Sequence, residues 1–146
     1  MTMDDKRCVV DTNVLVHGTV RGGGKHEEAR EWLTSLQRQG ATLCVTTQIL
    51  REYLAVLTSR RFFEKTFTPD EAVSEVEGLL PSLRVLDEPT GCAALLRDLV
   101  RRYEVRGAQI HDANIVAVML YHGVPRIATY NRSHFGQFHE VSLEPV

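Results

Sequence analysis

The chain reads Val9-Val10-Asp11-Thr12-Asn13-Val14-Leu15-Val16 near its start, an apolar run that is interrupted by an acid and two polar residues. The short β-branched run before Asp11 predicts a strand that is buried on both faces and ends at this acid. In an open α/β sheet, ligands bind at the carboxyl ends of the strands, so Asp11 is a candidate site residue. Alternatively, Asp11 forms an Asx-turn and caps the following turn together with Thr12 and Asn13.

Apolar strands alternate with helices along the rest of the chain. No convincing hairpin turn joins two strands, which predicts an α/β fold with a mostly parallel central sheet and helices on both faces. Helix caps are expected at Thr46 or Thr47, at Thr68 and at Thr90. We expect strands over 42–45, 83–86, 126–129 and near Val141, helices over 26–39, 48–59, 69–80, 91–103 and 111–122, and a polar loop over 130–138.

The composition is that of one globular domain covering residues 1–146. The chain has 43% hydrophobic residues, enough for a sizeable core. Its net charge of −2 gives no global positive field, so any nucleic-acid binding must be local. Arg60, Arg61 and Lys65 flank two phenylalanines, a pattern compatible with a partner surface or with the base of a helical hairpin. Further arginines gather late in the chain, at Arg101, Arg102, Arg106, Arg126 and Arg132, and for the first two we favour a solvated helix face.

Several features exclude other classes of protein. Cys8, Cys44 and Cys92 are odd in number and widely spaced, which argues against disulfides or a zinc site and predicts small core residues. The glycines of 22–24 lack the spacing of a phosphate-binding loop and are interpreted as a hinge. The start of the chain has no apolar signal segment, and no apolar run could span a bilayer. We therefore expect a soluble, cytoplasmic protein with no membrane partner.

Three acids stand out as candidate metal ligands. Asp11 ends a strand, Glu52 borders the apolar face of a predicted helix, and Asp112 lies in the first turn of a nearly all-apolar helix. Each has a structural explanation as a cap, a solvated glutamate or a partner of the helix dipole. Together they are the oxygen ligands that Mg²⁺ or Mn²⁺ accepts, and without a cation they would repel one another. Such a site activates water for phosphoryl transfer.

The same residues resemble a known family. Asp11-Thr12-Asn13, Glu52 in the helix after the second strand, His111-Asp112-Ala113 and the pair Thr129-x-Asn131 resemble PIN-domain ribonucleases, particularly VapC-type toxins of toxin–antitoxin pairs. The resemblance covers essentially the whole chain. It implies a three-layer α/β/α PIN-like fold and a Mg²⁺- or Mn²⁺-dependent endoribonuclease that leaves a 3′-hydroxyl and a 5′-phosphate. It also implies three partners: RNA, a cognate antitoxin and a second copy of the chain in a homodimer.

The resemblance also assigns roles to residues. Asp11 and Asp112 would be metal ligands, Glu52 would be a third acid acting directly or through water, and Asn131 occupies the family's fourth position. A second group would position the substrate: Thr12, Asn13, Thr129, Arg132 and His134. His134 stands where the family often has Asp, which leaves the three-acid site intact and gives His134 a possible contact with RNA or metal.

Two alternatives to a nuclease remain. A haloacid-dehalogenase-like phosphatase also begins with an acid after the first strand, but it normally needs a second Asp where this chain has Asn13. A non-catalytic PIN-fold module that binds RNA or acts as a scaffold is the alternative outside enzymes. Metal-dependent RNA cleavage that is abolished by Asp11→Asn discriminates between the three.

Overall fold

The computed structural model describes residues 6–59 and 66–146, and the Arg60–Lys65 cluster lies outside them. Five strands form one sheet in the order β3-β2-β1-β4-β5. All four strand pairs are parallel, which confirms the predicted α/β class. The strands are β1 (Arg7–Val10), β2 (Thr42–Thr46), β3 (Arg84–Leu86), β4 (Arg126–Ala128) and β5 (Ser142–Leu143).

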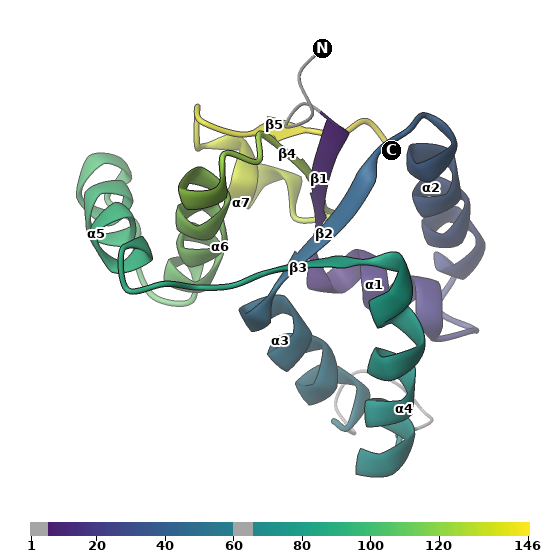
Figure 1. Ribbon diagram of the computed structural model, residues 1–146. Helices are drawn as coiled ribbons and strands as arrows, with labels where there is room; N and C mark the ends of the chain where they lie inside the picture. The colour runs from purple at the N-terminus through teal and green to yellow at the C-terminus, as the bar shows by residue number, and fades with distance from the viewer. Residues whose placement is uncertain (1–5, 60–65) are drawn as a thin grey trace.

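Helices cover both faces of the sheet, as the three-layer prediction requires (Figure 1). α5 and α6 lie on one side of the strands, and α1 and α2 lie on the other. α3 follows β2 directly and packs against α1 and α4. The helices are α1 (Thr12–Thr19), α2 (His26–Arg38), α3 (Thr47–Leu57), α4 (Pro69–Leu79), α5 (Cys92–Tyr103), α6 (Gln109–His122) and α7 (Arg132–Gly136), with a 3₁₀ turn over Leu80–Ser82. Among the described residues, every helix is too short or too polar to cross a membrane.

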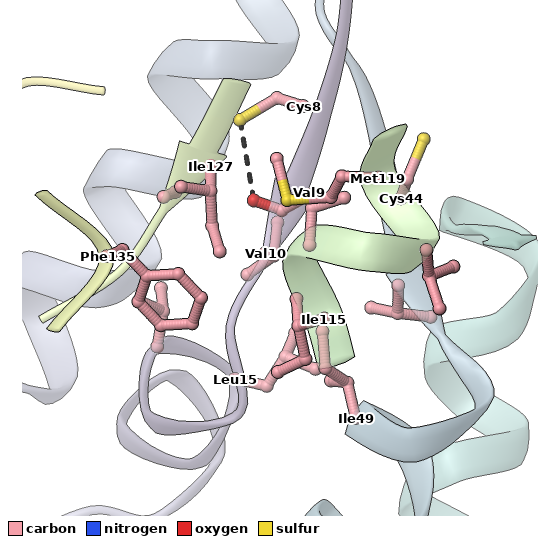
Figure 2. Close-up of a cluster of buried hydrophobic side chains, with 14 of the residues drawn as sticks. Cys8, Val9, Val10, Leu15, Cys44, Ile49, Ile115, Met119, Ile127 and Phe135 are labelled. Carbon is pink, nitrogen blue, oxygen red and sulfur yellow. Dashed lines mark hydrogen bonds between the residues drawn. The ribbon is translucent and has the colours of Figure 1, made fainter. Parts of the chain in front are cut away.

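β1 is the central strand and is buried on both faces, as predicted. Val9 and Val10 are fully buried and lie beside Ile115 and Met119 of α6 (Figure 2). The nearly all-apolar sequence of α6 is explained by this position, since the helix packs between the sheet and α5. The three cysteines are buried and unpaired, as expected of small core residues: Cys8, Cys44 and Cys92.

Two elements differ from the predictions. The apolar run after Asp11 forms α1, a helix that the sequence analysis did not predict, because three consecutive buried residues hide its helical periodicity. The predicted polar loop over 130–138 is wrong as well, because it contains α7. Phe135 and Phe138 anchor that segment in the core, where they are 0% and 1% exposed.

The predicted helix caps have mixed outcomes. Thr46 caps α3 by accepting a hydrogen bond from the Ile49 amide at 3.1 Å. Thr68 and Glu71 form the predicted capping box of α4. The predicted cap at Thr90 is wrong, because α5 begins after Gly91 and no side chain caps it.

Candidate active site

Asp11 lies at the carboxyl end of the central strand and also caps α1. Its side chain is almost fully buried, at 3% exposure for the residue. Oδ1 accepts a hydrogen bond from the Thr12 amide at 2.8 Å, and Oδ2 accepts one from the Thr129 hydroxyl at 2.7 Å. The cap and the site position are therefore compatible, because one carboxylate serves both.

Glu52 is fixed by two hydrogen bonds and does not bend freely into solvent. The Thr12 hydroxyl donates to Oε2 at 2.9 Å, so α1 and α3 are linked beside Asp11. The Gln48 amide, one turn earlier on α3, donates to Oε1 at 2.8 Å. Both oxygens of Glu52 are thereby oriented by neighbouring side chains.

Asp112 enters the site from the first turn of α6. Its side chain is 18% exposed, and its Oδ2 lies 3.1 Å from Nδ1 of His134 on α7. His134 itself is 43% exposed. His134, which stands where the family often has Asp, therefore contacts the candidate acid Asp112 directly.

The three acids line one pocket of about 250 Å³. Burial, together with the smaller effect of the nearby charges of Asp112 and Glu52, raises the pKa of Asp11 to about 6, against the opposing effect of its two hydrogen bonds. Burial also raises the pKa of Asp112. A bound cation would favour the charged form of both groups. In the part of the chain that the structure describes, no lysine or arginine lines the pocket, and the lining residues are Asp11, Thr12, Asn13, Val16, His17, Glu52, Val56, Asp112 and Asn131.

The donor chemistry of this pocket fits a hard divalent cation, because its three ionisable acids offer only oxygen ligands. Within residues 6–59 and 66–146, however, no three His, Cys, Asp or Glu side chains are grouped so that they could hold a metal ion together. Mg²⁺ usually binds through one or two carboxylates and keeps several waters. The arrangement therefore fits two direct carboxylate ligands, with the third acid acting through water.

Some of the remaining predicted residues line the pocket of the acids, and others do not. Asn13 lines the pocket, and its Oδ1 accepts a hydrogen bond from the Tyr130 amide at 3.2 Å. Thr129 is buried and contacts Asp11, while Asn131 is exposed at the pocket. Arg132 is not among the lining residues, and its guanidinium donates to the Glu144 carbonyl at 2.8 Å. That contact gives Arg132 a role in holding the C-terminal segment.

Other late arginines are also engaged away from the acids. Arg102 lies 2.9 Å from Asp98 and 2.6 Å from Glu140, and its side chain is 49% exposed. This is consistent with the predicted solvated helix face. Arg126 pairs with Glu144 at 2.6 Å. Neither arginine lines the pocket of the acids.

The sequence analysis missed Gln48, which connects two elements of the site. Gln48 is 4% exposed, and its amide donates to Glu52 and to the His111 carbonyl, both at 2.8 Å. Its Oε1 accepts a hydrogen bond from Asn114 at 2.8 Å. Gln48 thereby fixes α3 to the first turn of α6, next to Asp112. In the sequence, the role of Gln48 is indicated only by its position four residues before Glu52, which places the two side chains on the same face of a helix.

Replacing Gln48 with alanine is expected to lower the free energy of unfolding by about 1–3 kcal/mol, because Glu52, Asn114 and the His111 carbonyl each lose one hydrogen bond and the buried volume of the side chain is left empty. Urea unfolding measures this loss. Gln37→Ala, on the exposed side of α2, is the matched control and should change the free energy by less than about 0.5 kcal/mol. Equal stability of Gln48→Ala and the wild type would contradict the bridging role.

Comparison with known proteins identifies the family of this chain. Residues 8–141 match the sequence profile of the PIN domain. The chain belongs to the PIN-domain family. This confirms the predicted resemblance, and the PIN domain covers all three acids of the pocket.

Relatives of this PIN domain carry ribonuclease names. Ribonuclease VapC48 of Mycobacterium tuberculosis is 26% identical over 135 residues, which are 91% of this chain and 92% of the relative. Ribonuclease VapC43 of the same organism is 28% identical over 113 residues, covering 76% and 77%. These names agree with the predicted function of a toxin-like endoribonuclease.

Solved structures share the fold of this PIN domain. VapC20 of M. tuberculosis, described as a sarcin–ricin loop cleaving toxin, aligns with a TM-score of 0.70 at 20% identity and covers 92% of this chain and 98% of its own. VapBC2 of Rickettsia felis, bound to a DNA fragment from its promoter, aligns with a TM-score of 0.69 at 17% identity and covers 94% and 97%. The predicted PIN-like fold is confirmed.

Proposed function

We propose that this PIN domain, as a single domain over residues 1–146, is a toxin-like endoribonuclease that hydrolyses RNA phosphodiesters with a metal-activated water. One observation carries the proposal: acids from three separate elements, β1–α1, α3 and α6, line one pocket, and no lysine or arginine of residues 6–59 and 66–146 lines it with them. Its relatives named as ribonucleases support the RNA substrate.

Asp11 and Asp112 would hold the Mg²⁺ or Mn²⁺ ion. When bound, such an ion lowers the pKa of water and offsets the charge that develops on the phosphate. Thr12 and Thr129 fix the two oxygens of Asp11, so the carboxylate needs little reorganisation. Glu52, oriented by Thr12 and Gln48, would orient the attacking water.

The other polar residues would bind the substrate. Asn131, exposed at the pocket, and Asn13 would contact the scissile phosphate, and Thr12 would help to position it through the two acids to which it donates hydrogen bonds. His134 would contact either RNA or the ion from its position on Asp112. Arg132 and Thr129 would act indirectly, because their polar groups are engaged by Glu144 and Asp11.

An antitoxin is the protein partner that fits this proposal. Several solved relatives of the same fold are toxin–antitoxin assemblies, among them a complex from Klebsiella pneumoniae. A homodimer and a cytoplasmic location complete the proposal. Affinity purification of the tagged protein from its own cells, followed by mass spectrometry of the bound proteins, tests the antitoxin partner: a small protein recovered in stoichiometric amount supports it, and recovery of the chain alone contradicts it.

RNA cleavage by the purified protein tests the proposed function. We expect cleavage with Mn²⁺ or Mg²⁺, none with EDTA, and products that carry 5′-phosphates and 3′-hydroxyls. Asp112→Asn should abolish cleavage, whereas Asp70→Asn, an exposed acid on α4, should not change it. Binding of RNA without cleavage under all these conditions would favour the non-catalytic PIN module, and release of phosphate from small phosphate esters would favour the phosphatase.

Changing His134 tests its contact with Asp112. His134→Asp places a second carboxylate next to Asp112, so we expect tighter metal binding and a shift in preference from Mn²⁺ toward Mg²⁺, since imidazole suits softer ions. His134→Ala should lower cleavage while leaving the fold intact, because the side chain is 43% exposed. Cleavage rates at graded Mn²⁺ and Mg²⁺ concentrations measure both effects. Equal rates and equal metal preference in all three proteins would make His134 a solvated surface residue.

A further inference from the structure

Among the described residues, the walls of the pocket of the acids contain no lysine or arginine, yet the proposed substrate carries a negative charge on every phosphate. A bound metal ion compensates charge at only one point. Phosphates next to the scissile one therefore need cations at the rim of the pocket. The turn between α1 and α2, residues 20–25, supplies such a cation at Lys25.

This turn is packed onto a wall of the pocket through His17. His17 lines the pocket, and its main-chain carbonyl lies 3.0 Å from Nδ1 of His26, the first residue of α2. A Cβ atom placed on Gly23 would lie 3.7 Å from Nδ1 of His17. Nδ1 is buried without a hydrogen-bond partner among the described residues. The glycine turn, interpreted from the sequence as a hinge, thus covers the back of the His17 ring.

Lys25, at the end of the turn, lies over the ring of Tyr130, the residue before Asn131 in the pocket lining. Its ammonium lies 4.2 Å from the centroid of the Tyr130 ring. Tyr130 precedes the pocket residue Asn131, and its amide is bound by Asn13. The ring is braced edge-on by His17, with centroids 5.6 Å apart, and by the indole of Trp32 at 5.4 Å.

The charge of Lys25 is available to a ligand. Lys25 is exposed, and it forms no ion pair with any residue in the described part of the chain; the same holds for Arg21 at the other end of the turn. The nearest acid tied to Tyr130 is Glu28, which accepts a hydrogen bond from the hydroxyl end of the ring at 3.0 Å. Glu28 is therefore held by the tyrosine hydroxyl.

We propose that Lys25, seated on Tyr130, binds an RNA phosphate next to the one at the acids. This rests on the proposed function for the identity of the substrate. A lysine ammonium binds phosphate as a point charge, without reading the base, so the subsite fixes the path of the RNA backbone and carries no sequence preference. RNA then enters the pocket along the side formed by His17, Tyr130 and the turn.

RNA binding by full-length Lys25→Gln tests the proposal. Fluorescence anisotropy with a single-stranded RNA oligonucleotide, in the non-cleaving Asp11→Asn background, should give about tenfold weaker binding. The slope of log K against log salt should also fall by about 0.7, the value for one phosphate contact on a single strand. Lys25→Arg keeps the cation and should bind within about twofold of the parent.

The matched control is Arg38→Gln, which removes the same charge from the exposed end of α2 and should leave the affinity and slope of the parent. Unchanged affinity and slope in Lys25→Gln would overturn the proposal, and so would an equal loss in Arg38→Gln, since the effect would then be one of net charge. Failure of the proposed function is seen separately, as absence of metal-dependent cleavage by the wild type.

Discussion

Asp11→Asn is expected to reduce RNA cleavage by about a thousandfold or more while the metal-free protein keeps or gains thermal stability. Loss of a charged metal ligand removes several kcal/mol of transition-state stabilisation, and about 4 kcal/mol corresponds to a thousandfold. Because Asn caps helices as well as Asp does, α1 should begin at the same residue.

The free energy of unfolding of Asp11→Asn should equal or exceed that of the wild type, because burying the charged Asp11 carboxylate costs free energy. A pKa raised from 3.8 to about 6 corresponds to about 3 kcal/mol against the charged form at neutral pH. Asn avoids this cost but loses about 1 kcal/mol of hydrogen bonding, since its single oxygen cannot accept from both Thr12 and Thr129. A net gain of about 1–2 kcal/mol is expected.

Cleavage assays and urea unfolding in EDTA measure the two effects on the same preparation. Asp70→Asn serves as control for both, because this acid on α4 is exposed and remote from the pocket. A variant of Asp11 that loses about 1 kcal/mol and still cleaves RNA would give this residue the role of a helix cap alone.

The metal-free wild type is expected to lose stability relative to Asp11→Asn as the pH rises from about 4 to above 6. The folded-state pKa of Asp11 lies above its unfolded value of 3.8, so the folded protein binds more protons between these values. The stabilising contribution is therefore complete below pH 3.8 and is lost as the pH passes through about 6. The change with pH in the free energy of unfolding of the wild type relative to Asp11→Asn should reach about 3 kcal/mol. The hydrogen bonds that the variant loses do not depend on pH and are not included in this value.

Mn²⁺ should reverse this loss over the same pH range. Metal ligands must be deprotonated, so stabilisation by the ion grows as Asp11 and Asp112 ionise, and at a hundred times Kd it reaches about 2.7 kcal/mol. Urea unfolding from pH 4 to 7.5, with EDTA and with millimolar Mn²⁺, gives both curves. A difference between wild type and Asp11→Asn that does not vary with pH would contradict the buried titration. Equal curves with and without Mn²⁺ at pH 7 would contradict the metal site.

Local patterns in the sequence were sufficient for much of the fold. The alternation of strands and helices predicted a parallel sheet, since parallel strands need a crossover between them. The capping box at Thr68 and the stop of β1 at Asp11 are short-range features that depend on neighbouring residues alone. Membership of the PIN family followed from short motifs, because their residues and order are written in the chain itself.

Other elements depended on burial that no local pattern shows. α1 and α7 carry apolar residues that are buried by distant parts of the chain, so neither element has a clear helical periodicity in sequence. The roles of the site residues stay predictions, but their placement is set by the strand order. That order puts β4 beside β1, which brings Thr129 to Asp11 across 118 residues.

The tertiary structure alone decided which side chains act on the acids and which do not. Gln48 bridges Glu52 and the start of α6 because a buried amide must find partners in whatever surrounds it. Arg132 turns to the Glu144 carbonyl, although its sequence position next to Asn131 predicted a substrate contact. Lys25 lies over Tyr130 only because the ring of Tyr130, which follows β4, packs against His17 of α1 and Trp32 of α2. Local sequence thus determined the elements and the chemical groups, and long-range packing determined which groups meet.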